Sequence, residues 1–443
     1  MNNKIEINFT LWIIYLIFGL FFVWFFLPAI FGLFAEDIPP IDDSDLALKK
    51  VIISDDENIY FDLMELEDLN YSRLISSDID INSLLFEDSW NNDTVERVLN
   101  ENEELLEKID DMLEKSAYQN PNFADPENIE MNMEINFPST YFWRDMVEIK
   151  ALEALYLSKK GSHKEAIEEV LKLIEVGHKI QNSQLSSSEY LTTIGIKKVG
   201  LKILQKIISS SELSSLEISN YAKKLDAFYD DGYGLESALK IEYYGILRQI
   251  GIIAGGDKEA IKDYAESMGA GRRMIQKIKS DYFFQPNKTK SYFAGTSRAD
   301  IATIEQLCGE AEGAEIVEFF IVDPNFGPYT ENFIGKTTYQ LSSVSLAEMN
   351  QARCEQNLFL SVTRAMMGIR AFKNDHGKYP DSLDELVPVY LPSIPIDPFD
   401  ENPIRYSPEK KIIYSIGRSM EDLGGSSGDN WSKMKNPTFK ISF

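Results

Sequence analysis

The sequence predicts a mainly α-helical protein that ends in a small α+β module. Two observations support this prediction. Apolar residues recur at spacings of three and four over most of the chain between residues 92 and 375, which is the period of helices with one buried face. Beyond residue 376, closely spaced prolines and two short runs of strand-forming residues replace that period.

The composition limits the classes of partner. The chain has 443 residues, a length that suggests two or three domains, and 44% of them are apolar, which is enough for packed cores. Its 71 acidic and 44 basic side chains give a net charge of −27. Binding to nucleic acid or to anionic lipid head groups needs a positive surface, so we expect neither, and we interpret the acidity as a solvated surface.

The first element is a long apolar run. Residues 9–35 carry no charged side chain, and about 20 apolar residues span a bilayer. We therefore expect a transmembrane helix over 9–35, a cytoplasmic tail over 1–8, and the bilayer as a partner. The simplest topology is a single-pass protein of the cell membrane with its large domain outside the cytoplasm. The alternative is a cytoplasmic domain on a membrane tether.

Residues 36–140 are predicted to form an acidic linker followed by a helical segment. The sequence IPPIDDSD, residues 38–45, is expected to be an extended tether, because proline disfavours a helix at the preceding residue. Apolar residues at helical spacing between 95 and 113 then predict one amphipathic helix.

Residues 141–341 are predicted to form a helical domain. A first helix ends at Gly161, and Ser162 with Glu165 three residues later forms a capping box for a second helix up to residue 182. This hairpin resembles one tetratricopeptide-type unit, although no sustained 34-residue period follows. Further helices are predicted over 189–209, 216–229 (capped by Ser214 or Ser215), 235–254 and 257–279.

Residues 342–443 are predicted to form a long helix and a small antiparallel sheet. The helix covers 342–375 and ends at Gly377. Ser382 and Glu385 cap a very short helix, after which prolines fix an extended path. Two strands are predicted over 404–406 and 411–416.

This C-terminal region also resembles the end of the major pseudopilins of type II secretion. The residues that carry the resemblance are Lys378-Tyr379-Pro380, Ser382-Leu383, Leu386-Val387-Pro388, Tyr390-Leu391, Pro395, Asp397-Pro398-Phe399, Arg405-Tyr406, Tyr414-Ser415-x-Gly417 and Gly424-Gly425. A similar tail occurs on uncharacterised bacterial envelope proteins with one membrane span and a helical domain. The segments Gln285-Pro286-Asn287-Lys288-Thr289 and Asn332-x-Ile334-Gly335 resemble that second group.

The resemblance implies a calcium site, and the sequence offers few other site residues. Asp422 and Asp429 are the calcium candidates, because major pseudopilins bind calcium in the corresponding loop, although Arg418-Ser419-Met420 replaces the family's Ala-Asp-Gly. Cys308 and Cys354 either form a disulfide or remain two buried thiols. No catalytic or cofactor-binding constellation is recognisable.

We therefore expect a non-enzymatic, membrane-anchored envelope protein that acts as a scaffold or protein-interaction module and has a protein partner in the envelope. The first alternative is a component of a type II secretion or pilus-like assembly. Asn8 and Ile13 count against it, because they stand where pilin-type proteins have Gly and Glu around the start of the span. The second alternative is a cell-envelope hydrolase that uses a carboxylate pair.

Overall fold

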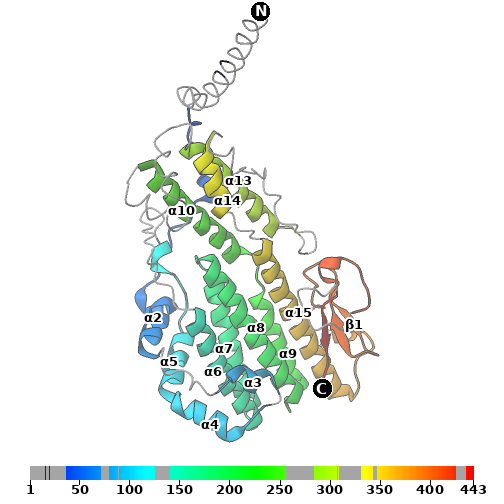
Figure 1. Cartoon of the computed structure of the whole chain (residues 1–443). Helices are drawn as coiled ribbons and strands as arrows, with labels where there is room; N and C mark the ends of the chain where they lie inside the picture. Colours follow the sequence, from blue (N-terminus) through cyan, green and yellow to red (C-terminus); the bar gives the residue numbers. More distant parts are fainter. Residues whose placement is uncertain are drawn as a thin grey trace, which may run out of the picture. The chain divides into compact units, whose positions relative to one another are not determined.

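The structure is a computed structural model that describes residues 15, 19, 36–70, 79–87, 89–124, 140–255, 284–306, 308, 331–342, 347–425 and 436–443. Within these residues the protein is mainly helical and has one small antiparallel sheet, which confirms the predicted fold class at this level (Figure 1). The chain divides into two compact units. Unit 1 takes the described residues within 1–46, 243–299 and 314–345, and unit 2 takes those within 47–242, 300–313 and 346–443.

Most of the helices that the structure describes belong to unit 2. They are α2 (Ile59–Asn70), α3 (Ile81–Phe86), α4 (Asn92–Glu101), α5 (Glu103–Leu113), α6 (Thr140–Lys159), α7 (His163–Gln181), α8 (Ser187–Ser210), α9 (Ser215–Lys224) and α15 (Ala347–His376). Helix α14 (Phe333–Ser342) lies in unit 1. Helices α10 (Tyr233–Gly255) and α13 (Pro286–Ile304) contribute residues to both units.

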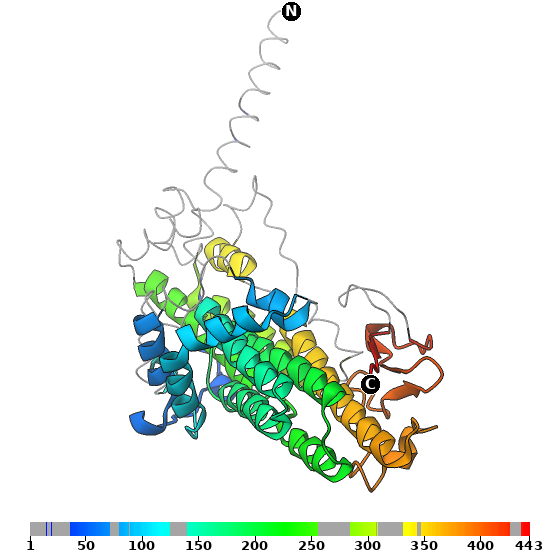
Figure 2. The same ribbon diagram turned by 90° about the horizontal axis from the view of Figure 1, so that it is seen from below.

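Helices α6, α7 and α8 lie side by side and form the centre of unit 2, as Figures 1 and 2 show. Glycine permits the close approach of α7 and α8, because a Cβ atom at Gly200 would lie 2.6 Å from Cγ1 of Ile174. The start of α8 is fixed by a capping box between Ser186 and Glu189. Helix α15 then packs against α8 and α9.

The structure corrects two local predictions. Ser162 does precede α7, but its side chain makes no capping hydrogen bond, because its backbone angles (φ −79°, ψ 55°) are not those of an extended cap residue. The single helix predicted between 95 and 113 is two helices, since the chain breaks at Asn102, whose side chain donates to the carbonyl of Val98. The helix predicted over 257–279 lies outside the described residues.

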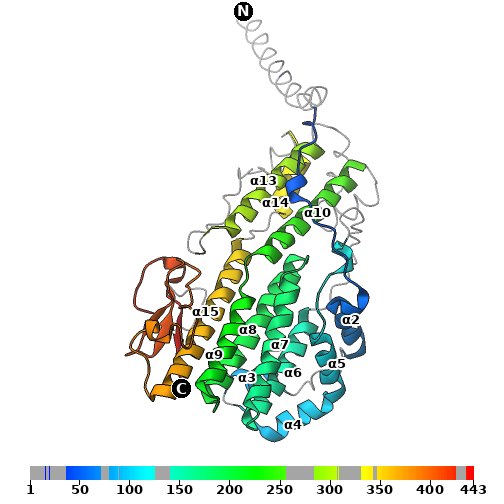
Figure 3. The same ribbon diagram turned by 180° about the vertical axis from the view of Figure 1, so that it is seen from behind.

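The C-terminal module follows the predicted path. A short helix, η7 (Leu383–Leu386), starts at the predicted capping box of Ser382 and Glu385. Leu386 and Leu391 are fully buried against α15, where Gly368 leaves room for them. Strands β1 (Arg405–Ser407), β2 (Ile412–Tyr414) and β3 (Thr438–Lys440) pair antiparallel in that order, and β2 contacts α15. Figure 3 shows the C-terminal module, in orange and red, beside α15.

A buried polar contact organises unit 1. The backbone N–H of Gln285 donates to Oδ1 of Asn332 over 2.9 Å, and the Asn332 amide donates to Oγ1 of Thr289 over 3.1 Å. All three residues are fully buried, and Gly335 faces them without a side chain. The two segments singled out by resemblance, 285–289 and 332–335, thus form one packed contact.

The acidic segment 36–46 is bound to α13 within unit 1. Asp37 accepts hydrogen bonds from the backbone N–H groups of Asn287 and Lys288 at the start of that helix, over 2.7 and 3.0 Å. Further along, Asp43 pairs with Lys290 over 2.8 Å, and Asp45 pairs with Arg298. No α-helix covers residues 38–45, which were predicted to be an extended tether, and the acidic residues of this segment pair with basic side chains of α13.

The prediction of a transmembrane helix is corrected as well. None of the helices in the described part of the chain is both long and apolar enough to cross a bilayer. Of the expected span over 9–35, only Tyr15 and Gly19 are described, and the rest lies outside the described residues together with the predicted tail over 1–8. The single-pass membrane location, with a large domain outside the cytoplasm, therefore has no support from the structure.

Unit 2 contains a lysine in its interior. Lys197 on α8 is 1% exposed, and its ammonium donates to Oε1 of Gln181 over 2.6 Å and to the carbonyl of Phe228 over 2.9 Å. Nδ1 of His178 lies 3.5 Å away. Burial lowers the pKa of Lys197 to about 8, and burial together with the charge of Lys197 lowers the pKa of His178 to about 4.

The lowered pKa of Lys197 predicts that the stability of the protein depends on pH. Between pH 8 and 10.5 the unfolded chain holds the Lys197 proton and the folded chain does not, so the free energy of unfolding should rise with pH in this range. Relative to Lys197→Met, the wild type should gain up to about 3 kcal/mol across this range, as measured by urea denaturation at several pH values. Lys223→Met on α9 is the matched control, and parallel curves for wild type and Lys197→Met would contradict the prediction.

Candidate binding pocket

Of the two predicted calcium ligands, the structure describes Asp422 but not Asp429. Asp422 lies after the 3-10 turn that follows β2, with its side chain half exposed, and one carboxylate oxygen is 3.5 Å from Nε of Arg405. Asp429 lies outside the described residues. Calcium binding at Asp422 and Asp429 therefore stays a prediction. In the structure the Asp422 carboxylate lies beside the guanidinium of Arg405.

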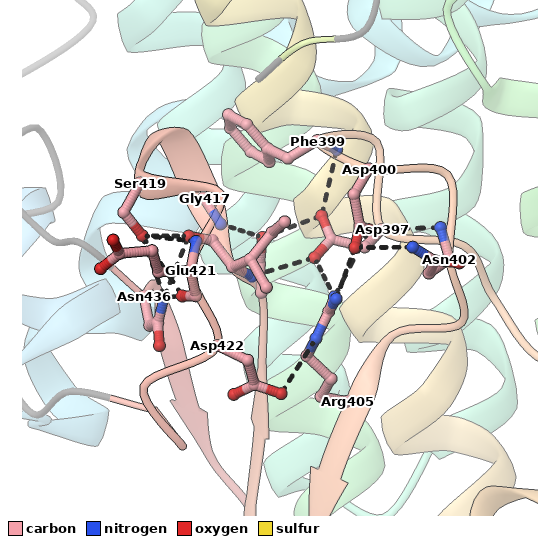
Figure 4. A network of polar contacts seen from close by, with 12 residues as sticks. Asp397, Phe399, Asp400, Asn402, Arg405, Gly417, Ser419, Glu421, Asp422 and Asn436 are labelled. Atoms are coloured by element: carbon pink, nitrogen blue, oxygen red, sulfur yellow. Dashed lines mark hydrogen bonds and ion pairs between the residues drawn. The ribbon is translucent and has the colours of Figure 1, made fainter. Parts of the chain in front are cut away.

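Arg405 connects three carboxylates in the C-terminal module. Figure 4 shows its guanidinium between Asp397, Asp400 and Asp422. Nη1 donates to the fully buried Asp397 over 2.9 Å, and Nη2 donates to Asp400. Asp397 also accepts hydrogen bonds from Oγ of Ser415 and from backbone N–H groups, although burial still raises its pKa. The guanidinium of Arg405 thus supplies the positive charge that the three carboxylates share.

The two cysteines are joined in unit 2. Cys308 and Cys354 form a disulfide that closes a loop with a sequence separation of 46 residues. Cys354 is buried on α15, so the bond attaches the chain after α13 to that helix. Closing a loop of this length restricts the unfolded chain and thereby favours the folded state.

A second acidic group surrounds a buried lysine. Asp110 of α5, Glu153 of α6 and Glu169 of α7 have carboxylate oxygens within 4.8 Å of one another. The ammonium of Lys150, which is 1% exposed, pairs with all three, at 2.6 Å from Glu153 and 2.7 Å from Glu169. These hydrogen bonds outweigh desolvation and raise the pKa of Lys150. The three acids therefore neutralise the buried ammonium of Lys150, and these ion pairs connect α5, α6 and α7.

Among the described residues, a pocket lies between α3, α6 and α8, a hollow of about 480 Å³. Its apolar wall includes Val147 of α6, Ile196 and Val199 of α8, and Phe86 of α3. Val147 and Ile196 are buried, whereas Phe86 and Val199 are half-buried. Apolar hollows of this size with a few polar groups are typical of ligand sites.

Basic side chains surround the apolar wall. Lys198 and Lys202 follow each other one turn apart on α8, and Arg144 comes from α6. Lys198 pairs with Glu355 over 3.2 Å, whereas the Lys202 ammonium lies 5.4 Å from the centre of the Phe86 ring. Desolvation and the charge of Lys198 lower the pKa of Lys202. In a chain with a net charge of −27, this cationic rim is a local exception.

One carboxylate lines the pocket within the described residues. Glu148 of α6 is 5% exposed and accepts a hydrogen bond from the amide of Asn82 over 2.7 Å. Arg144 lies 3.7 Å from the same oxygen. Burial raises the pKa of Glu148, which is the largest effect on this group. With its two partners, Glu148 fixes α3 to α6 and forms a polar edge of the pocket.

Gly195 leaves one part of the pocket wall without a side chain. It lies within α8 and is exposed, and a Cβ atom there would meet no atom within 4 Å. Glycine inside a helix costs about 1 kcal/mol relative to alanine, and packing does not require it here, in contrast to Gly200. This pocket was not predicted from the sequence. The available signal was a glycine followed by lysines at helical spacing in an acidic chain.

Comparisons of the sequence with models of protein families, with curated proteins and with solved structures found no match.

The Arg405 network predicts a large effect of one substitution. Arg405→Gln leaves the buried Asp397 without its cation, so the free energy of unfolding should fall by about 3 kcal/mol or more, as measured by urea denaturation. Asp422→Asn is the matched control. Its side chain is half exposed, so we expect a change of about 1 kcal/mol or less. Equal small effects for both variants would show that Arg405 does not stabilise the module.

Proposed function

We propose that this protein is a non-enzymatic interaction module that holds a segment of a protein partner in the pocket between α3, α6 and α8. The observation that carries this proposal is an apolar hollow with a cationic rim, open to solvent at Gly195. The hairpin of α6 and α7, with α8 packed against both, supports the tetratricopeptide-like part of the predicted fold. Helical hairpins of that kind commonly present grooves to peptides.

A component of a secretion or pilus-like assembly is the second candidate. It is supported by the order of elements in the C-terminal module, where the long helix α15 is followed by a short capped helix and a three-stranded antiparallel sheet. This order agrees with the resemblance to major pseudopilins. A carboxylate-dependent hydrolase has weaker support, because Lys150 pairs with the clustered carboxylates of Asp110, Glu153 and Glu169.

The proposed function predicts that occluding the pocket removes partner binding without harm to the fold. Gly195→Leu fills the open part of the wall, where nothing lies within 4 Å, and should raise the free energy of unfolding by a few tenths to 1 kcal/mol through helix propensity. A photo-crosslinking residue at position 199 should form an adduct with the partner in the native cells. The Gly195→Leu variant should lose that adduct.

The matched control is Gly251→Leu on α10, where a Cβ atom also meets nothing within 4 Å. It should gain similar stability and keep the adduct. A crosslinking residue at position 223 on α9 should give no adduct. If the adduct at position 199 persists in Gly195→Leu, the pocket is not the partner's binding site and the proposal fails.

A further inference from the structure

The charge on the pocket rim is not balanced. Lys198 has a carboxylate partner in Glu355, but among the described residues no carboxylate lies within ion-pair distance of Lys202. The two lysines are four residues apart on α8, a spacing that brings like charges together and destabilises a helix. An anion placed beside both lysines would remove this repulsion.

Apolar surface lies directly beside these lysines. The aromatic ring of Phe86 is 5.4 Å from the Lys202 ammonium, and Val199 precedes Lys202 by less than one turn on the same face of α8. A ligand that matches this arrangement needs a negative group and an apolar group within a few ångströms of each other. Adjacent acidic and aliphatic or aromatic residues of a peptide provide that combination.

Two features favour a chain segment over a small enclosed molecule. Asn82, Arg144, Gly195 and Lys202 are exposed, so the pocket is open along its rim and leaves room for a chain to enter and leave. At Gly195 the surface of α8 is bare backbone, which allows a peptide to approach more closely than any other residue would.

We propose that the partner segment held in this pocket carries an aspartate or glutamate next to an aliphatic or aromatic residue. The carboxylate pairs with Lys202 and Lys198, and the apolar side chain packs against Phe86, Ile196 and Val199. This inference rests on the proposed function and adds the chemistry of the ligand. Glu148 sets a limit on it, because a second acidic group placed deeper in the pocket would be repelled by that buried carboxylate.

The test is a selection with the full-length protein against a displayed library of random heptapeptides. We expect the selected peptides to share an acidic residue beside Leu, Ile, Val or Phe. Lys202→Glu should weaken their binding about ten- to hundredfold, since a charge-assisted hydrogen bond contributes about 1.5–3 kcal/mol. Replacing the acidic residue of the peptide by its amide should cause a similar loss. Lys223→Glu on α9 is the matched charge control and should bind like the wild type.

The other outcomes separate the two proposals. Peptides without an acidic residue that are lost in Gly195→Leu would overturn the proposed ligand chemistry and leave the pocket as the binding site. Peptides whose binding survives Gly195→Leu would overturn both. If no peptide is selected while dodecanoate binds and is lost in Lys202→Glu, the ligand is a free anionic amphiphile, and the peptide proposal is wrong.

Discussion

The arrangement of unit 2 depends on the close approach of α7 and α8. Gly200 makes this contact possible from α8 and Gly177 from α7, because a Cβ atom at either position would collide with the facing helix. The approach buries Lys197 and directs the opposite side of α8 toward α3 and α6, where the pocket lies. The buried polar interior and the pocket are therefore two faces of one helix, and both depend on its fixed position.

Charge has different roles in different parts of this acidic chain. Among the described residues, three carboxylates between α5, α6 and α7 surround the buried Lys150, and the carboxylates of the C-terminal module surround the half-buried Arg405. Lys197 is buried with uncharged partners instead, which is why its pKa falls while that of Lys150 rises. At the pocket rim the cation Lys202 faces solvent and an aromatic ring, an arrangement that leaves its charge available to a ligand.

Sequence patterns over a few residues predicted helices and caps, but they did not predict contacts between residues far apart in the chain. The long helix α15 and the capping box of Ser382 and Glu385 follow from spacing and cap residues within a few positions. Strand β3 was missed, because its three residues acquire their strand character only by pairing with β2. The pocket combines residues as far apart as Asn82 and Lys202 from three helices, and no pattern along the chain specifies how those helices meet. Of the residues that line the pocket, only Gly195 is recognisable from the local sequence, because it is a glycine in a helix interior.

The binding of Asp37 to the first turn of α13 also affects how the chain is made. Its partner, the backbone N–H of Asn287, is 250 residues further along the chain. At roughly 5–20 residues per second, a ribosome needs on the order of 10–50 seconds to synthesise that length. Throughout this interval the acidic segment has no helix to cap, and the segments of unit 2 up to residue 242 emerge before unit 1 can close. Unit 1 is thus completed late in synthesis, although it contains the first described residues of the chain.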